Sequence, residues 1–100
     1  MFIHHVVFWL KPGTPDAARE QLIADCGKFL GGVPGVRHLW AGRCAMTPRD
    51  VVDNSYDVGL CVILDDEPAH RIYQDHPLHH DFIARNKAHW ERVQVRDFIG

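Results

Sequence analysis

Pro77 interrupts the stretch of the chain that is richest in chemically active side chains, Tyr73-Gln74-Asp75-His76-Pro77-Leu78-His79-His80. Proline has no backbone N–H to donate, and its ring disfavours the helical conformation for the residue before it. One helix is therefore expected to end at about residue 75, and another to start just after the proline. This places Tyr73 at the end of the first helix and His79 at the start of the second.

The segments before and after this junction carry strand and helix patterns in turn. Residues 2–10 are rich in β-branched and aromatic side chains and end at a Lys-Pro-Gly turn. Thr14-Pro15-Asp16 has the order N-cap, first-turn proline and acidic residue, which predicts a helix of about sixteen residues. Further strands are expected over residues 36–46, 56–64 and 93–99, with a bulge or a bend at Gly42. A last helix is expected to carry Phe82, Ile83, Asn86 and Trp90.

The order strand, helix, strand, strand, split helix, strand is that of the ferredoxin-like α+β fold, a four-stranded antiparallel sheet with helices on one face. Both faces of residues 2–10 are mostly apolar, which indicates that both sides of this strand are covered. The helices can cover only one face, and a bare apolar face is a liability for a soluble monomer. The sequence therefore predicts a single domain over residues 1–100 that forms a homodimer.

Composition argues against several classes of partner. The chain has 11 Lys and Arg against 13 Asp and Glu and a pI near 6.4, so it offers no basic surface for nucleic acid or anionic lipid. RNA binding, which the ferredoxin-like topology permits, is not supported, because residues 56–62 lack a basic-Gly-aromatic signature. No apolar run approaches the roughly 20 residues of a membrane helix.

The cysteines and the first residues of the chain bear on its location. Cys26, Cys44 and Cys61 are odd in number, widely spaced and never in a CxxC pair, which is typical of a protein from a reducing compartment. The apolar residues 1–10 contain His4 and His5 and lack a basic leader and a small-residue cleavage site, so they indicate a strand and not a signal peptide. A cytoplasmic protein is expected.

Several motifs, in this order within one short chain, resemble the stress-responsive A/B barrel (Dabb) family over essentially the whole length. The resemblance implies a dimeric α+β barrel in which two four-stranded sheets face each other, with a ligand pocket near the helical side of each chain. The motifs are Ile3-His4-His5-Val6-Val7-Phe8, the small loop near Pro34 and Gly42, Ser55-Tyr56-Asp57-Val58, Tyr73 to His79, and Val95-Arg96-Asp97-Phe98.

Some members of this family are plant polyketide cyclases, which close an aromatic ring on a linear poly-β-ketone without a cofactor or metal. They use the tyrosine and histidine of a YxxHPxH motif, and the resemblance assigns these roles to Tyr73 and His79. A neutral imidazole with a pKa of about 6.5 can accept an acidic α-proton, and a phenol can donate a hydrogen bond to the developing enolate oxygen. We expect Tyr73 and His79 to be catalytic, His5, His76 and Trp9 to bind substrate, and no cofactor to be needed.

The two histidines of the first strand cannot both contribute to one pocket, because consecutive strand residues point to opposite faces of the sheet. The resemblance places His5 in the pocket. We therefore expect His5, and not His4, to share a cavity with His79.

A metal site made of His76, His79 and His80 is not expected. Adjacent residues diverge on a helix, so His79 and His80 cannot easily bind one ion. No partner cysteine or Glu-containing helical motif accompanies them.

Three classes of function stay open: a cofactor-independent lyase or cyclase acting on a small carbonyl compound, a small-molecule-binding or stress-associated dimer without chemistry, and a cofactor-free monooxygenase. The last rests on fold analogy alone. Tyr73 can equally be a packing residue, and His76 a cap at the helix junction. A cavity where Tyr73 and His79 converge favours chemistry, whereas a cavity filled by Trp9, Trp40 or Trp90 favours packing.

Overall fold

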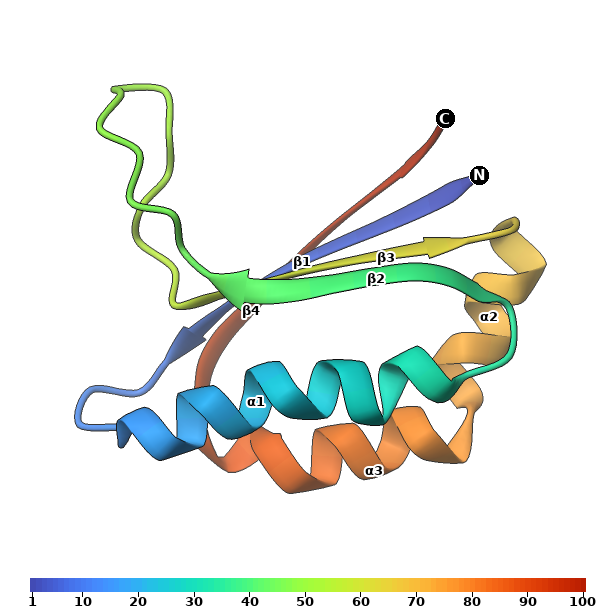
Figure 1. Ribbon diagram of the computed structural model, residues 1–100, viewed down its shortest axis with the longest axis horizontal. Coiled ribbons are helices and arrows are strands. Elements are labelled where there is room, and N and C mark those ends of the chain that lie inside the picture. Colours follow the sequence, from blue (N-terminus) through green and yellow to red (C-terminus); the bar gives the residue numbers. More distant parts are fainter.

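Four strands form one antiparallel sheet in the computed structural model, which describes residues 1–100 (Figure 1). The strands lie in the order β2-β3-β1-β4, so β1 pairs with β3 on one side and with β4 on the other. This is the ferredoxin-like arrangement expected from the sequence. In chain order the elements are β1 (Phe2–Leu10), α1 (Asp16–Lys28), the 3-10 turn η1 (Leu30–Gly32), β2 (Val36–Arg43), β3 (Val58–Leu64), α2 (Glu67–Asp75), α3 (Pro77–Asn86), the 3-10 turn η2 (Lys87–His89) and β4 (Trp90–Ile99).

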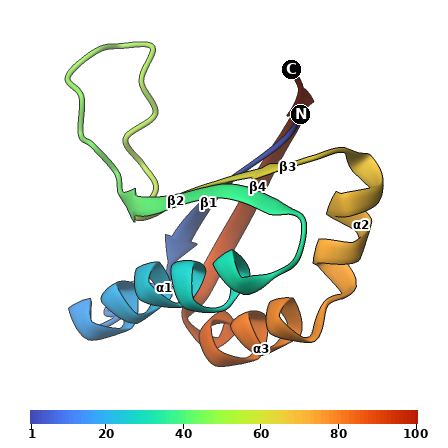
Figure 2. The same ribbon diagram turned by 45° about the vertical axis from the view of Figure 1, so that its right-hand side comes forward.

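All three helices lie on one side of the sheet. Figures 1 and 2 show α1 and α3 side by side below the strands, with α2 linking the end of β3 to α3. The loop between β2 and β3 projects from the opposite side of the sheet. The layer between sheet and helices therefore holds the core, while no helix covers the other sheet face.

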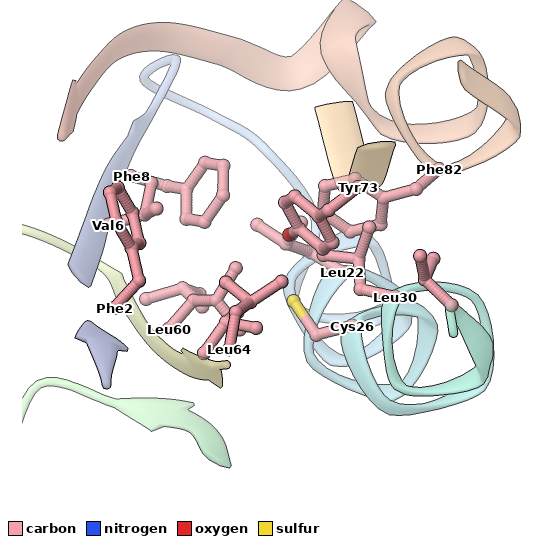
Figure 3. Close-up of a cluster of buried hydrophobic side chains, with 13 residues drawn as sticks. Phe2, Val6, Phe8, Leu22, Cys26, Leu30, Leu60, Leu64, Tyr73 and Phe82 are labelled. Atoms are coloured by element: carbon pink, nitrogen blue, oxygen red, sulfur yellow. The ribbon is translucent and has the colours of Figure 1, made fainter. Parts of the chain in front are cut away.

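The core is built from alternate residues of the strands and from the inner faces of the helices (Figure 3). In β3 every second side chain is buried, because successive strand residues point to opposite faces of the sheet. Leu22 and Cys26, one helical turn apart on α1, face this layer and are almost fully buried. Burial raises the pKa of the Cys26 thiol to about 12, so this cysteine is an inert core residue.

A buried carboxylate joins α1 to α3. Asp25 Oδ2 accepts hydrogen bonds from Arg85 Nε at 2.8 Å and from Asn86 Nδ2 at 2.9 Å. Burial by itself raises the pKa of Asp25, but the hydrogen bonds from Arg85 and Asn86 and the charge of Arg85 lower it overall. The carboxylate therefore stays ionised and fixes the spacing between the two helices below the sheet.

The helix junction predicted at Pro77 is present. α2 ends at Asp75 and α3 begins at Pro77, with His76 between them in an extended conformation. Asp66 caps the N-terminus of α2 by accepting a hydrogen bond from the backbone N–H of Ala69 at 2.9 Å. The predicted end of one helix and start of the next are confirmed.

Three local predictions were wrong. Pro15, and not Thr14, is the N-cap residue of α1, because the Thr14 hydroxyl donates to the Lys11 carbonyl within the preceding turn. The pairing of β2 with β3 is regular at Gly42, and its irregularity lies between Val36 and His38. Trp90 begins β4 and is not part of α3, because η2 ends the helical segment at His89.

The outer sheet face, which points away from the helices, carries a group of apolar side chains beside the polar or charged His5, His38, Arg92, Gln94 and Arg96. Two of its aromatic side chains are well exposed, Trp40 at 61% and Phe98 at 58%. The strand register places the following apolar residues on this outer face: Ile3, Val7 and Trp9 of β1, Trp40 of β2, Cys61 and Ile63 of β3, and Phe98 of β4. None of the helices is long and apolar enough to cross a lipid bilayer.

Candidate active site

A cavity of about 190 Å³ lies between the sheet and the α2–α3 segment. An engineered apolar cavity of about 150 Å³ is large enough to bind benzene, so this space accommodates a ring-sized group. Its walls are mostly apolar, with a few polar side chains among them, which is the usual composition of a small-molecule site. The lining residues are His4, Val6, Phe8, Leu30, Leu60, Tyr73, Gln74, His79, Phe82, Ile83, Trp90, Val93 and Val95.

The two residues expected to be catalytic lie side by side in this cavity. Tyr73 comes from the last turn of α2 and His79 from the first turn of α3, so the break at Pro77 brings them together. Their rings meet edge to face with centroids 4.9 Å apart. Tyr73 is only 1% exposed, and burial, followed by the nearby Cys26, raises the pKa of its phenol. Tyr73 therefore stays neutral and keeps a proton to donate.

His79 has hydrogen-bonding capacity that the chain does not use. Its Nδ1 is buried and has no hydrogen-bond partner. Burial is the main cause that lowers the pKa of the imidazole, and the nearby His4, His80 and His70 lower it further. The ring is therefore neutral at neutral pH, which is the state that accepts a proton.

His4, and not His5, shares the cavity with Tyr73 and His79, so the prediction for His5 was wrong. His4 is 6% exposed, and its ring centroid lies 5.6 Å from that of Tyr73. Its Nδ1 is 2.7 Å from Asp97 Oδ1, to which it donates a hydrogen bond. His5 is exposed on the outer face, beside a shallow hollow that also includes Trp40. The prediction assumed that His5 faces the helices, but His4 does. A shift of one residue exchanges the two faces of a strand.

Trp9 and His76, expected to bind substrate, also lie outside the cavity. Trp9 is on the same face of β1 as His5, where its Nε1 donates to Ser55 Oγ at 3.0 Å and the Arg92 guanidinium lies 4.4 Å from its ring centroid. His76 caps α3, because its Nδ1 accepts a hydrogen bond from the backbone N–H of Leu78 at 3.1 Å. Of the five expected residues, the structure brings only Tyr73 and His79 together at the cavity.

Trp90 is a cavity residue that sequence reasoning did not assign to the site. It stands at the start of β4 with its ring centroid 5.0 Å from that of Phe8, and its Nε1 is buried without a hydrogen-bond partner. The indole forms one wall of the cavity and does not fill it. His79 and Trp90 thus both line the cavity, and each has a buried ring nitrogen that has no hydrogen-bond partner in the chain.

His70 is a second residue that sequence reasoning did not identify. It lies one turn before Tyr73 on α2, and this i to i+3 spacing was the signal that could have placed it near the site. Its ring stacks on Phe2, with centroids 4.3 Å apart, and lies 4.8 Å from the ring of His4. Burial, followed by the nearby His4, lowers the pKa of His70.

These features define an α+β domain of ferredoxin-like fold with a cavity between its sheet and helices that is partly open to solvent, since the lining residues Val93 and Val95 are exposed. The sequence matches the family model of the stress responsive A/B barrel domain, Dabb, over residues 3–99. The chain therefore belongs to the Dabb family.

Solved structures from several organisms share the fold. A Dabb family protein with a ferredoxin-like fold from Mesorhizobium loti is 27% identical, with a TM-score of 0.79 over 99% of this chain and 95% of that chain. A dimeric ferredoxin-like protein of unknown function from Thermobifida fusca is 22% identical, with a TM-score of 0.84 over 99% of this chain and 90% of that chain. A hydroxynitrile lyase from Passiflora edulis is 16% identical, with a TM-score of 0.79 over 99% of this chain and 93% of that chain. No curated protein matches the sequence.

Proposed function

We propose that the cavity binds a small carbonyl-containing or phenolic molecule, and that the protein acts on it as a cofactor-independent lyase of the polyketide cyclase kind. The observation that carries this proposal is the convergence of Tyr73 and His79 on one apolar cavity, with their rings 4.9 Å apart. In this proposal His79 is the general base and Tyr73 is the hydrogen-bond donor.

The unused ring nitrogens support a polar ligand in this position. A buried nitrogen without a hydrogen-bond partner costs about 1–3 kcal/mol, so a ligand that supplies the partner gains that amount. His79 Nδ1 and Trp90 Nε1 are such nitrogens, and both residues line the cavity. The indole N–H can only donate, so it favours a ligand with an acceptor oxygen, such as a carbonyl.

The protonation states of the two residues fit proton abstraction next to a carbonyl group. The lowered pKa of His79 keeps its imidazole neutral and able to accept the α-proton. The raised pKa of Tyr73 keeps its phenol protonated, so that it can donate a hydrogen bond to the enolate oxygen as negative charge develops. The protonated His79 can then return the proton when the new bond forms or the leaving group departs.

His4 takes the position that was first expected for His5. Because an ionised carboxylate can only accept, the hydrogen bond to Asp97 fixes the proton of His4 on Nδ1 and leaves Nε2 as an acceptor. In this proposal His4 orients a hydroxyl group of the ligand.

The lyase class is compatible with this architecture, because a hydroxynitrile lyase from Passiflora edulis has the same fold. The alternative is a small-molecule-binding protein without chemistry, which the almost complete burial of Tyr73 in the core supports. Nothing in the cavity specifically favours the cofactor-free monooxygenase.

Turnover by matched variants tests the proposal. With a carbonyl compound that the wild type converts, His79→Ala should lower kcat by roughly 10²–10⁴-fold, as expected for loss of a general base. Tyr73→Phe should also lower kcat, because one donor to a developing oxyanion is worth up to about 2.7–4 kcal/mol. The decrease should be smaller than that in His79→Ala. His80→Ala, on the exposed side of the same turn, is the control and should keep most of the activity, because His80 affects His79 only by lowering its pKa. Unchanged kcat in folded His79→Ala would overturn the assignment.

We further propose that the protein is a homodimer formed through the outer sheet face. This face carries exposed aromatic side chains, and an apolar surface of this kind on a soluble protein is typical of an interface. The β2–β3 loop, which projects on the same side, carries the exposed Met46 and Val51 and can extend the contact. A protein from Thermobifida fusca with this fold is dimeric.

The three free cysteines fit the cytoplasmic location that we also propose.

A further inference from the structure

Three potential metal ligands converge at the edge of the cavity from three different elements. His4 comes from β1, His70 from α2 and Asp97 from β4. One ligand atom of each residue lies within 4.8 Å of the ligand atoms of the other two. The two imidazoles are almost completely buried, whereas Asp97 is on the exposed edge strand. None of these contacts is needed for the roles proposed for Tyr73 and His79.

His70 is the part of this cluster that packing alone does not explain. It is 7% exposed, and its Nε2 is buried without a hydrogen-bond partner. The stacked contact with Phe2, at an interplanar angle of 20°, fixes the plane of the imidazole. An apolar side chain at this position would make the same stacked contact without an unpaired nitrogen. The imidazole is therefore better explained by a ligand that it binds.

We propose that His4, His70 and Asp97 bind one divalent transition-metal ion of the zinc type. Two imidazole nitrogens and one carboxylate oxygen are a common protein ligand set for zinc and for cobalt, whereas magnesium and calcium prefer oxygen ligands only. Three protein ligands leave a fourth position of the tetrahedral ion for water. Water can reach this position from the side of Asp97, because the Asp97 side chain is 35% exposed.

The observed separations are compatible with an ion after a small adjustment. Tetrahedral bonds of about 2.0–2.1 Å require ligand atoms about 3.3 Å apart. His4 Nδ1 and Asp97 Oδ1 are already 2.7 Å apart because they share a proton. The three ligand atoms lie within 4.8 Å of one another, so His70 must also come closer to the other two, and the exposed Asp97 side chain has more freedom to adjust than the two buried rings. The ion would replace the shared proton, so His4 Nε2 would then carry the ring proton and would donate to the ligand hydroxyl instead of accepting from it.

Cobalt is a suitable probe for this site, because four-coordinate Co²⁺ has a strong visible absorption that six-coordinate aqueous Co²⁺ lacks. The full-length chain, freed of metal, should bind one Co²⁺ per chain with this absorption, and Zn²⁺ should displace it. His70→Phe keeps the stacking on Phe2 and removes one ligand, so it should weaken Zn²⁺ binding by roughly tenfold or more. His80→Phe changes an exposed histidine outside the cluster and should bind Zn²⁺ like the wild type.

Asp97→Asn gives a second variant that keeps an acceptor for the His4 N–H but loses the negative charge. It should also weaken Zn²⁺ binding while leaving the circular dichroism spectrum unchanged. Equal Zn²⁺ affinity in wild type, His70→Phe and Asp97→Asn would overturn the proposal. So would an equal loss in His80→Phe, or a wild type that takes up Co²⁺ without the four-coordinate absorption.

Discussion

Tyr73 belongs both to the hydrophobic core and to the candidate site. Its ring lies among Leu22, Cys26 and Phe82 (Figure 3), and the same ring forms one side of the cavity next to His79. Because the core holds the ring in one orientation, the hydroxyl is positioned without help from a ligand. A packing role and a functional role for Tyr73 are therefore compatible.

The neutral state of His79 predicts a pH dependence of stability. Its pKa in the folded chain is lowered from 6.5, mainly by burial and then by His4, His80 and His70, while Asp75 acts in the opposite direction. Below pH 6.5 the unfolded chain takes up this proton first, so the free energy of unfolding falls as the pH falls towards the folded-state pKa. Above pH 6.5 neither state carries the proton and this effect is absent.

The measurement is the melting temperature of wild type and of His79→Gln, which has no titrating side chain at this position, at several pH values. Acidification through pH 6.5 should lower the melting temperature of the wild type more than that of the variant. Parallel curves for the two proteins would show that His79 is not kept neutral by burial.

At the scale of single residues, the sequence predicted the pair Tyr73 and His79 but not their neighbours. The resemblance to the Dabb family assigned roles to this pair, and Pro77 fixes the helix junction that places Tyr73 at the end of one helix and His79 at the start of the next. The choice between His4 and His5 depends on which side of β1 faces the helices, and both sides of this strand are mostly apolar. The pattern therefore gave no basis for the choice.

At the scale of elements, the junction between α2 and α3 determines where Tyr73 and His79 meet. His76 stabilises this junction by accepting a hydrogen bond from the backbone N–H of Leu78 at the start of α3. Loss of an N-cap acceptor costs about 0.5–2 kcal/mol. His76→Ala should lower the free energy of unfolding by this amount, and His76→Asn, which restores a cap acceptor, should recover most of it.

Urea denaturation of these two variants and of His80→Ala measures the effect. His80 lies on the exposed side of α3 and should contribute little. A result in which His76→Ala is as stable as the wild type, or no less stable than His76→Asn, would mean that the hydrogen bond to Leu78 does not stabilise the junction.

The order and type of the elements followed from local patterns, whereas some of their details did not. Strands rich in β-branched residues and the proline junction are local signals, and each is present in the structure. The hydrogen bonds of Asp25 join it to Arg85 and Asn86, which are 60 and 61 residues away in the sequence, and so connect α1 to α3. No local pattern predicts contacts between residues so far apart in the sequence. The convergence of His4, His70 and Asp97 is another contact of this kind.

At the scale of the whole molecule, the proposed dimer would cover the outer sheet face. Static light scattering should give a mass of twice 11.5 kDa for the wild type. Phe98→Glu places a charge at an exposed aromatic position of this face and should shift the protein towards the monomer. Ile72→Glu changes a side chain of similar exposure, 59%, on the helical side and should stay dimeric. A wild type of 11.5 kDa at micromolar concentration would contradict the dimer.

A ligand screen by thermal shift tests the central claim, that the cavity beside Tyr73 and His79 is a binding site for a small carbonyl-containing or phenolic molecule. Such compounds are added to wild type, His79→Ala and His80→Ala. At least one compound should raise the melting temperature of wild type and His80→Ala, and should raise that of His79→Ala clearly less, because the variant lacks the imidazole that meets the ligand. Equal stabilisation of all three proteins, or no stabilisation of the wild type by any compound, would contradict the claim.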